Sequence, residues 1–183
     1  LQSKPDEAYS AFFKSAWNAA WKDPAYFSIA QIDCIRGDWD MASEHIEQSL
    51  IRNWHNHKAR QLKASILRKS GKTDEALQWI EASLEIDRFN VGSLFEKWLL
   101  TGNEELKREM GTLLQGNPHS YIEYALDFAT AGLYDEAIEL LRWAVETNAG
   151  TYPITWYALG FFLSKSNKGD EAKDVYKKAF ELS

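Results

Sequence analysis

The residues best suited to chemistry are a lysine, two histidines and three acidic pairs, each in a short motif. Gly71-Lys72-Thr73 has the ending of a phosphate-binding loop, in which backbone amides and a lysine hold the phosphates of a nucleotide. Such a loop needs a second glycine at position 66, which is Ile66 here. Without that glycine-rich cradle the backbone lacks phosphate-binding geometry, so we interpret the motif as a turn between helices.

The two histidines, His55 and His57, lie on either side of Asn56 and could supply two ligands to a metal ion. Zinc needs three or four ligands, and the neighbouring sequence offers no third one. We therefore interpret the motif as a polar linker and expect no metal site.

The acidic pairs are Asp74-Glu75, Asp135-Glu136 and Asp170-Glu171. Two adjacent carboxylates can act as a general acid and a general base. These pairs, however, recur at the start of expected helices, where the helix dipole favours negative charge. The chain has four His and no legible Ser-His-Asp or Cys-His arrangement. We therefore expect no catalytic residue, no cofactor and no enzyme activity.

An alanine that follows these acidic residues recurs at a nearly fixed spacing. Ala8 to Ala42 and Ala42 to Ala76 are both 34 residues, and Ala137 to Ala172 is 35. A period in this range is typical of a solenoid, in which each repeat is one supersecondary unit and stacks on the next. The elements that position any functional side chain are therefore repeats.

Glycines and prolines predict where the helices of each repeat begin and end. Gly37, Gly71, Gly102 and Gly132 stand where helices should end, because glycine readily takes a left-handed conformation. Asp23-Pro24, Asn117-Pro118 and Tyr152-Pro153 are typical helix starts. Helical periodicity with no sustained alternation predicts no strands. The expected helices are 5–22, 24–36, 39–53, 57–70, 73–86, 91–101, 103–115, 118–131, 134–148, 152–166 and 168–182.

The last of these repeats carries the strongest family pattern. Trp156-Tyr157-Ala158-Leu159-Gly160-Phe161-Phe162-Leu163, followed by Ala172, Tyr176 and Ala179, resembles the tetratricopeptide repeat. The resemblance implies an all-α, right-handed α-solenoid of antiparallel helix pairs with about eleven helices and no strands. It implies one solenoid over residues 1–183, with a half repeat at 5–22 and repeats at 23–56, 57–90, 91–117, 118–151 and 152–183. The repeat 91–117 is degenerate, because Leu106 replaces the usual small residue.

Tracts in the first third also resemble the tail of large bacterial proteins that join a β-rich, sugar-processing type of domain to tetratricopeptide repeats. These tracts run over residues 11–18, 30–34 and 56–64. This second resemblance implies that the chain is a piece of a longer protein, as does a start at Leu1 instead of Met.

Composition limits the partners. The net charge of −6 disfavours nucleic acid, whose phosphates need a basic surface. The single cysteine, Cys34, fits a reducing compartment, and we expect a cytoplasmic protein. No stretch approaches the roughly 18 apolar residues that span a membrane, so we expect no membrane partner.

The first helix of each repeat should line the concave surface, which is the usual binding face of such solenoids. Helical spacing predicts that this face is basic and polar in the first half and apolar in the last repeats. The predicted peptide-binding residues are Phe27, Gln31, Lys58, Gln61, Ser65, Arg68, Lys69, Ile122, Leu126, Tyr157 and Phe161. A separate hypothesis pairs Asp33 with Arg60 or Lys63 between adjacent first helices; the alternative is that these charges face solvent.

Two functions fit this sequence. The first is a non-enzymatic scaffold that binds a peptide or protein segment in the groove. The alternative is a structural or oligomerisation appendage of a larger, carbohydrate-processing bacterial enzyme, packed on the upstream domain of its parent chain or on a second subunit. For the alternative, the half repeat with Trp17 and Trp21 has lost its partner helix, and the last helix carries Tyr176 and Phe180 without a polar capping helix. Self-association of the isolated chain is a further expectation.

Overall fold

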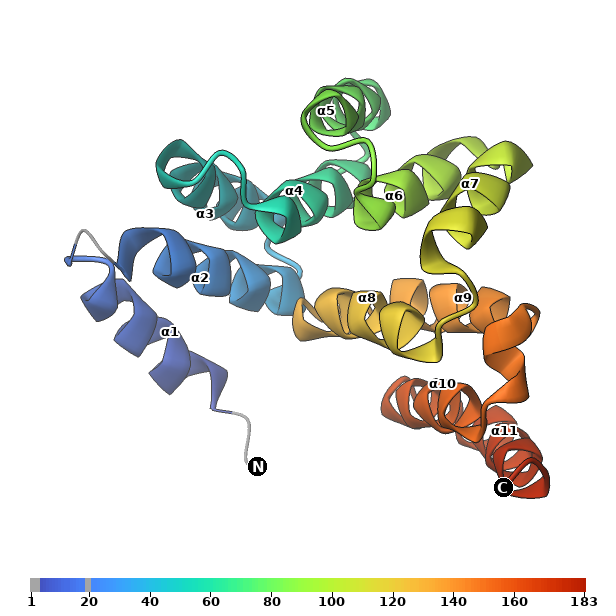
Figure 1. Cartoon of the computed structure of the whole chain (residues 1–183). Coiled ribbons are helices and arrows are strands. Elements are labelled where there is room, and N and C mark those ends of the chain that lie inside the picture. The colour runs from blue at the N-terminus through green and yellow to red at the C-terminus, as the bar shows by residue number, and fades with distance from the viewer. Residues whose placement is uncertain (1–3, 19–20) are drawn as a thin grey trace. The chain divides into compact units, whose positions relative to one another are not determined.

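The computed structural model describes residues 4–18 and 21–183, and it contains only helices within these ranges (Figure 1). The all-α fold class, with about eleven helices and no strands, is confirmed. The α-helices are α1 (Pro5–Ser15), α2 (Lys22–Arg36), α3 (Trp39–Arg52), α4 (His57–Lys69), α5 (Thr73–Ile86), α6 (Val91–Thr101), α7 (Glu104–Leu114), α8 (Pro118–Thr130), α9 (Tyr134–Val145), α10 (Pro153–Lys165) and α11 (Gly169–Glu181), and a short 3-10 helix, η2, covers Asn148–Thr151. Residues 19–20 of the expected half repeat lie outside the described residues.

Local capping explains most of the helix boundaries. Asn56 precedes α4 and accepts a hydrogen bond from the backbone N–H of Ala59 at 3.1 Å, and Asn90 and Asn117 cap α6 and α8 in the same way. An asparagine cap fixes a helix start because it satisfies a backbone donor that has no partner within the helix. Gly37 ends α2 at φ 73°, a left-handed conformation that glycine adopts without a steric penalty.

Asp23 has a different role from the one expected. The Asp23-Pro24 pair predicts a helix that begins at Pro24, but α2 begins at Lys22. The Asp23 carboxylate instead accepts hydrogen bonds from Ser49 Oγ at 2.5 Å and Asn53 Nδ2 at 2.8 Å. It therefore ties the start of α2 to the end of α3.

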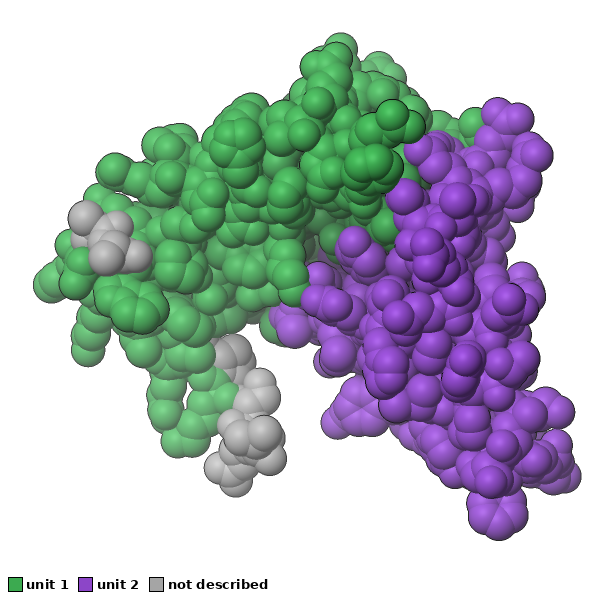
Figure 2. Space-filling model, viewed as in Figure 1, with its two compact units in different colours: residues 1–103 green, residues 104–183 purple. Residues whose placement is uncertain are grey.

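The chain forms two compact units, residues 1–103 (unit 1) and 104–183 (unit 2) (Figure 2). The division falls between α6 and α7, inside the repeat 91–117 that the sequence identifies as degenerate. Within each unit the strongest contacts join helices that are neighbours along the chain. These pairs are α1 with α2, α2 with α3 and α4 with α5 in unit 1, and α8 with α9, α9 with α10 and α10 with α11 in unit 2.

Small residues allow the paired helices to approach closely. Ala42, Ala76, Ala137 and Ala172, the residues that define the repeat period, are each at most 2% exposed. Leu106 stands at the corresponding place in α7 and is also buried. The periodic alanines are therefore core positions, and the acidic residues before them lie in the first turns of α5, α9 and α11.

Candidate functional site

The first helices share a common register that defines one face. The helices α4, α6, α8 and α10 begin at His57, Val91, Pro118 and Pro153. Residues four and eight places after each start lie on the same side of the helix, because these spacings are close to whole turns. The first of these positions holds Gln61, Phe95, Ile122 and Tyr157, and the second holds Ser65, Leu99, Leu126 and Phe161.

In unit 2 these positions form a patch of exposed apolar side chains on α8 and α10. Leu126, Tyr157 and Phe161 are 48%, 41% and 47% exposed, and Ile122 is half-buried. The two helices contact each other within unit 2. We call these four residues the apolar patch.

Packing within unit 2 holds the two patch residues of α10, Tyr157 and Phe161, in place. Tyr157 lies 6.2 Å from the ring of Tyr176 on α11, and Phe161 lies 5.3 Å from the ring of Phe162. Tyr176 can reach α10 because residue 160 is a glycine: a Cβ there would lie 2.6 Å from Tyr176 Cε1. The Lys165 ammonium lies 5.5 Å from the centre of the Phe161 ring, which places a cation at the rim.

In unit 1 three of the four register positions are buried and Leu99 is half-buried, so the expectation that Gln61 and Ser65 face solvent is wrong. Gln61 is 5% exposed and packs where Gly92 of α6 lacks a side chain; a Cβ there would lie 1.9 Å from Gln61 Oε1. Ser65 Oγ donates to Glu96 Oε1 at 2.6 Å. Both residues therefore join α4 to α6 and leave no surface for a ligand.

Arg68 also belongs to this contact between α4 and α6. Its Nε donates to Glu96 Oε2 at 2.6 Å and its Nη2 to Glu96 Oε1 at 3.2 Å. Glu96 is fully buried, and the Arg68 side chain is 17% exposed. Such a two-bond pair fixes the orientation of both groups. Arg68 is thus engaged by a neighbouring repeat.

The remaining predicted residues of unit 1 lie at or near the surface. Phe27 and Gln31 are half-buried on α2, and Lys58 and Lys69 are exposed at the two ends of α4. The basic half of the predicted groove is therefore reduced to the two lysines.

The predicted pair between Asp33 and Arg60 or Lys63 is wrong. Asp33 Oδ2 lies 2.7 Å from His45 Nδ1, and Lys63 pairs with Glu47. The alternative, that these charges face solvent, is also wrong for Arg60, which is fully buried. The expected packing residues of α4 are nevertheless buried: Ala59, Leu62, Ile66 and Leu67.

Arg60 is held by two tryptophans instead of a carboxylate. Its guanidinium carbon lies 4.6 Å from the ring centre of Trp54 and 4.2 Å from that of Trp79. Its Nε donates to Ser83 Oγ at 3.1 Å, and burial lowers the pKa of Arg60 from its ordinary value. Cation–π contacts of this kind partly compensate for lost hydration.

The Asp33–His45 pair was missed by the sequence analysis. Both side chains are at most 6% exposed, and the rings of Tyr26 and Phe13 lie 5.9 Å and 5.3 Å from His45. The arrangement joins α1, α2 and α3 around a buried polar pair. Because solvent and substrate cannot reach it, we interpret it as structural.

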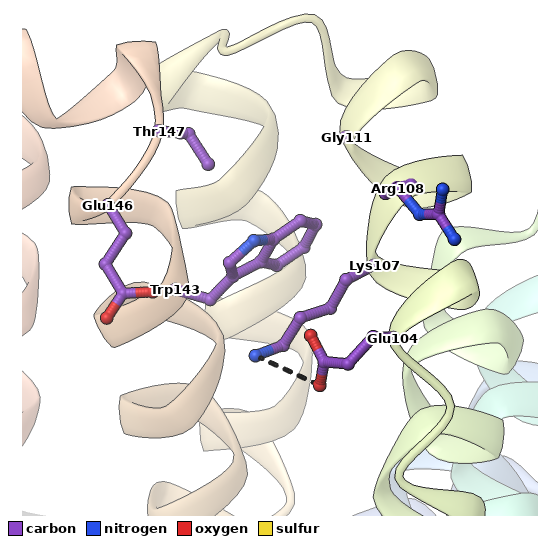
Figure 3. Close-up of a pocket in the computed structure, with 7 residues that line it drawn as sticks. All are labelled: Glu104, Lys107, Arg108, Gly111, Trp143, Glu146 and Thr147. Carbon is purple, nitrogen blue, oxygen red and sulfur yellow. Dashed lines mark ion pairs between the residues drawn. The ribbon is translucent and has the colours of Figure 1, made fainter.

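A second surface feature of unit 2 is a hollow between α7 and α9, of about 450 Å³ (Figure 3). Figure 3 shows Trp143 facing α7, with Lys107 directed toward Glu104 and Arg108 directed away from the indole. The lining residues are Glu104, Lys107, Arg108, Gly111, Trp143, Glu146 and Thr147. Unit 1 has a hollow of about 340 Å³ around Trp79, where the Lys63 ammonium already lies 3.7 Å from the ring centre. Neither hollow is evident from the sequence pattern.

Across residues 4–18 and 21–183, no group of three His, Cys, Asp or Glu side chains could hold a metal ion. No helix in the described part of the chain is long and apolar enough to cross a membrane.

Comparisons with known proteins concern the repeats. The family described as Tetratricopeptide repeat matches residues 57–90 and 154–183, and no curated protein matches the chain. Among solved structures, MamA 41-end from Desulfovibrio magneticus RS-1 is 15% identical, with a TM-score of 0.49 over 88% of this chain and 94% of that one. YrrB, described as a TPR protein with an unusual peptide-binding site, is 15% identical, with a TM-score of 0.46 over 94% of this chain and 92% of that one. Residues 57–90 and 154–183, each a pair of helices in the structure (α4 with α5, and α10 with α11), are thus tetratricopeptide repeats within an all-α chain.

Proposed function

We propose that the chain is a non-enzymatic scaffold that binds a segment of another protein on the apolar patch of unit 2. The observation that carries the proposal is the exposure of Leu126, Tyr157 and Phe161 on two adjacent first helices. Exposed apolar side chains are ordinary when scattered singly, but a contiguous group typically serves as an interaction surface. Repeat scaffolds bind their ligands on extended surfaces of this kind.

The size of the patch limits the affinity that it can supply. Full burial of a large apolar side chain contributes about 1.5–3 kcal/mol, and these side chains are already partly buried. Four of them therefore contribute about 4 kcal/mol, which is at the lower end of the cost of association, about 4–15 kcal/mol. We expect a partner segment to add polar contacts along α8 and α10, and the affinity to be micromolar or weaker.

Local chemistry favours a protein segment with an apolar face. The Lys165 ammonium lies at the rim, and Glu123, which follows Ile122 in α8, is exposed. An amphipathic helix or an extended peptide with two apolar anchors fits such a surface. We also propose that four predicted residues of unit 1 contact a partner protein: Phe27, Gln31, Lys58 and Lys69.

Site-specific photo-crosslinking tests the proposal. A benzophenone amino acid at position 126 should capture a partner protein from the native cell extract, and the same group at Phe180 should not. Phe180 is a matched control because it is exposed and apolar but lies on α11. The Leu126→Ser/Phe161→Ser variant should lose the partner, and Phe180→Ser should keep it. Equal capture at both positions would contradict a binding role for the patch.

A second candidate is an appendage that packs on another domain of its parent chain. The exposure of Trp17 and Trp21, 86% and 60%, favours it. The last helix favours it less than the sequence suggests, because Tyr176 is half-buried and exposed charged residues surround Phe180 on α11. The test is the Trp17→Ser/Trp21→Ser variant: loss of an assembly with the parent's upstream domain, with no effect of the patch variant, would support this candidate.

A further inference from the structure

The hollow between α7 and α9 lies on the second helices of unit 2, away from the first helices that carry the apolar patch. Its volume, about 450 Å³, falls within the roughly 300–1,000 Å³ that is usual for ligand pockets. Glu104, Lys107, Arg108 and Gly111 come from α7, and Trp143, Glu146 and Thr147 come from α9 and the residues that follow it.

Gly111 is the first sign that this hollow is more than a packing gap. Glycine destabilises the interior of a helix relative to alanine, and Gly111 lies inside α7 with no positive φ that would require it. Packing does not require it either: a Cβ would lie 3.9 Å from Trp143 Cζ2, an ordinary contact distance. The absence of this methyl group keeps the indole of Trp143 accessible from the α7 side.

The indole of Trp143 forms a rigid part of the wall of this hollow. Its ring lies 5.2 Å from that of Tyr121 in an edge-to-face arrangement at 76°, and Tyr121 is fully buried. An indole held in this way loses little freedom when a ligand binds, and this preorganisation favours binding. Trp143 is 9% exposed and lines the hollow.

The charges around the hollow favour an uncharged occupant. The lining holds two carboxylates, Glu104 and Glu146, and two cations, Lys107 and Arg108, so its formal charge is zero. Lys107 Nζ lies 3.9 Å from Glu104 Oε1, and Arg108 Nη2 lies 3.2 Å from Glu105 Oε1. A cation would meet Lys107 and an anion would meet Glu146, and neither would find an excess of opposite charge.

We propose that this hollow is a second binding site, separate from the apolar patch, and that it takes one neutral aromatic side chain of a partner protein. A neutral ring matches the indole of Trp143, since aromatic pairs gain from offset or edge-to-face contact. The hollow has room for such a ring, and the paired charges at the rim can hydrogen-bond to the partner's backbone.

Three capped amino acids test the proposal on the full chain: N-acetylphenylalaninamide, N-acetylargininamide and N-acetylglutamic acid amide. The readouts are the ¹H–¹⁵N signals of the Gly111 amide and the Trp143 indole N–H. We expect the phenylalanine probe to shift both signals and to approach saturation at millimolar concentration. The two charged probes should cause at most a tenth of that shift. An equal or larger shift with either charged probe, or a strictly linear response to the phenylalanine probe, would overturn the proposal.

Substitutions at glycine provide the matched control. Gly111→Met should place a side chain in the hollow and weaken the response to the phenylalanine probe at least tenfold. Gly169→Met should leave it unchanged, because Gly169 begins α11 with open space around it. Gly111→Ala separates a loss of binding from a loss of folding. It should raise the thermal midpoint by about 2–4 °C and still reduce the response to the phenylalanine probe. An undiminished response in folded Gly111→Met would contradict a site in this hollow.

Discussion

The first helices of the two units use the same register positions in opposite ways. In unit 1, Gln61, Ser65 and Phe95 are buried in or near the contact between α4 and α6. In unit 2, Leu126, Tyr157 and Phe161 are exposed on α8 and α10. One repeat family can thus use its first-helix face to join repeats or to present a surface. The residue on the facing helix, such as Gly92, helps to determine whether the face is buried or exposed.

The two units also differ in the forces that hold their repeats together. Unit 1 contains buried charged groups, Asp33, Arg60 and Glu96, each hydrogen-bonded to a side chain of another helix, although Arg60 Nη2 has no hydrogen-bond partner. Unit 2 relies more on apolar residues such as Tyr121, Phe128 and Phe162. Buried ion pairs contribute little net stability but become costly when one partner is removed. The register of unit 1 is therefore more sensitive to loss of a single polar side chain.

The largest predicted effect compares the two units at one register position. Phe95→Ala should reduce the free energy of unfolding by about 3–5 kcal/mol, because a fully buried ring is removed and a cavity remains. Tyr157→Ala should cost about 1 kcal/mol or less, because that ring is 41% exposed. Urea unfolding followed by circular dichroism measures both. Similar losses would show that the two faces do not differ as described.

Removing one side of the buried ion pair should have the next largest effect. Glu96→Ala leaves Arg68 and Ser65 without their carboxylate and should cost about 3 kcal/mol. In unit 2, Arg142→Ala breaks the exposed pair with Glu171 and should cost less than about 1 kcal/mol. The double variant Arg68→Met/Glu96→Leu should recover most of the loss in unit 1. No recovery would mean that the geometry of this pair, rather than its desolvated charge, determines the stability.

A smaller effect is expected at the close approach of α10 and α11. Gly160→Ala introduces a Cβ that would lie 2.6 Å from Tyr176 Cε1, so Tyr176 must move, at a cost of about 1–3 kcal/mol. Gly169→Ala meets no atom within 4 Å and should change the stability by less than about 0.5 kcal/mol. Thermal unfolding of the two variants separates packing from helix propensity. A stabilising Gly160→Ala would refute the close approach.

The smallest effect concerns the pH dependence of unit 1. Burial, with the nearby Asp33 carboxylate, raises the pKa of Cys34 from 9.0 to about 12. Because the folded pKa lies above the unfolded one, the contribution to stability is complete below pH 9 and is lost as the pH rises toward 12. Between pH 8 and 10 the loss should be about 1 kcal/mol.

The thiol reagent DTNB gives a second measurement of the same group. Cys34 should react with it only as fast as the chain unfolds, since the thiol is 5% exposed. The Cys34→Ala variant should show a shallower decline of stability with pH. Rapid labelling of the native chain at pH 8 would contradict a buried, protonated thiol.

Much of the fold could be predicted because its signals are local. The asparagine caps, Pro118 and Pro153 at helix starts, and the alanine period each act within one helix pair. Gly160 and Tyr176 also belong to one repeat, and a Cβ at residue 160 would lie 2.6 Å from Tyr176 Cε1. Helix boundaries therefore agree with the expected ones to within a few residues, except that the helix expected over 5–22 is wrong at its end, because α1 ends at Ser15.

The parts of the site that were missed depend on partners from other elements. The burial of Gln61 follows from Gly92 in the next repeat, and helix periodicity alone does not reveal that contact. Asp33 had two plausible cationic partners by register, yet it pairs with His45 on α3. The hollow beside Gly111 exists only because α7 and α9 bring that glycine against Trp143.

The contacts within each unit mainly join helices that follow one another along the chain. Such a structure has a low contact order, because few distant segments must meet before stabilising contacts form. Folding should accordingly be fast, on the order of milliseconds or less, as is typical of helical proteins rich in local contacts. A ribosome adds about 5–20 residues per second, so each helix pair has time to form before the next one is synthesised. The repeats of this chain can therefore assemble in the order in which they are translated.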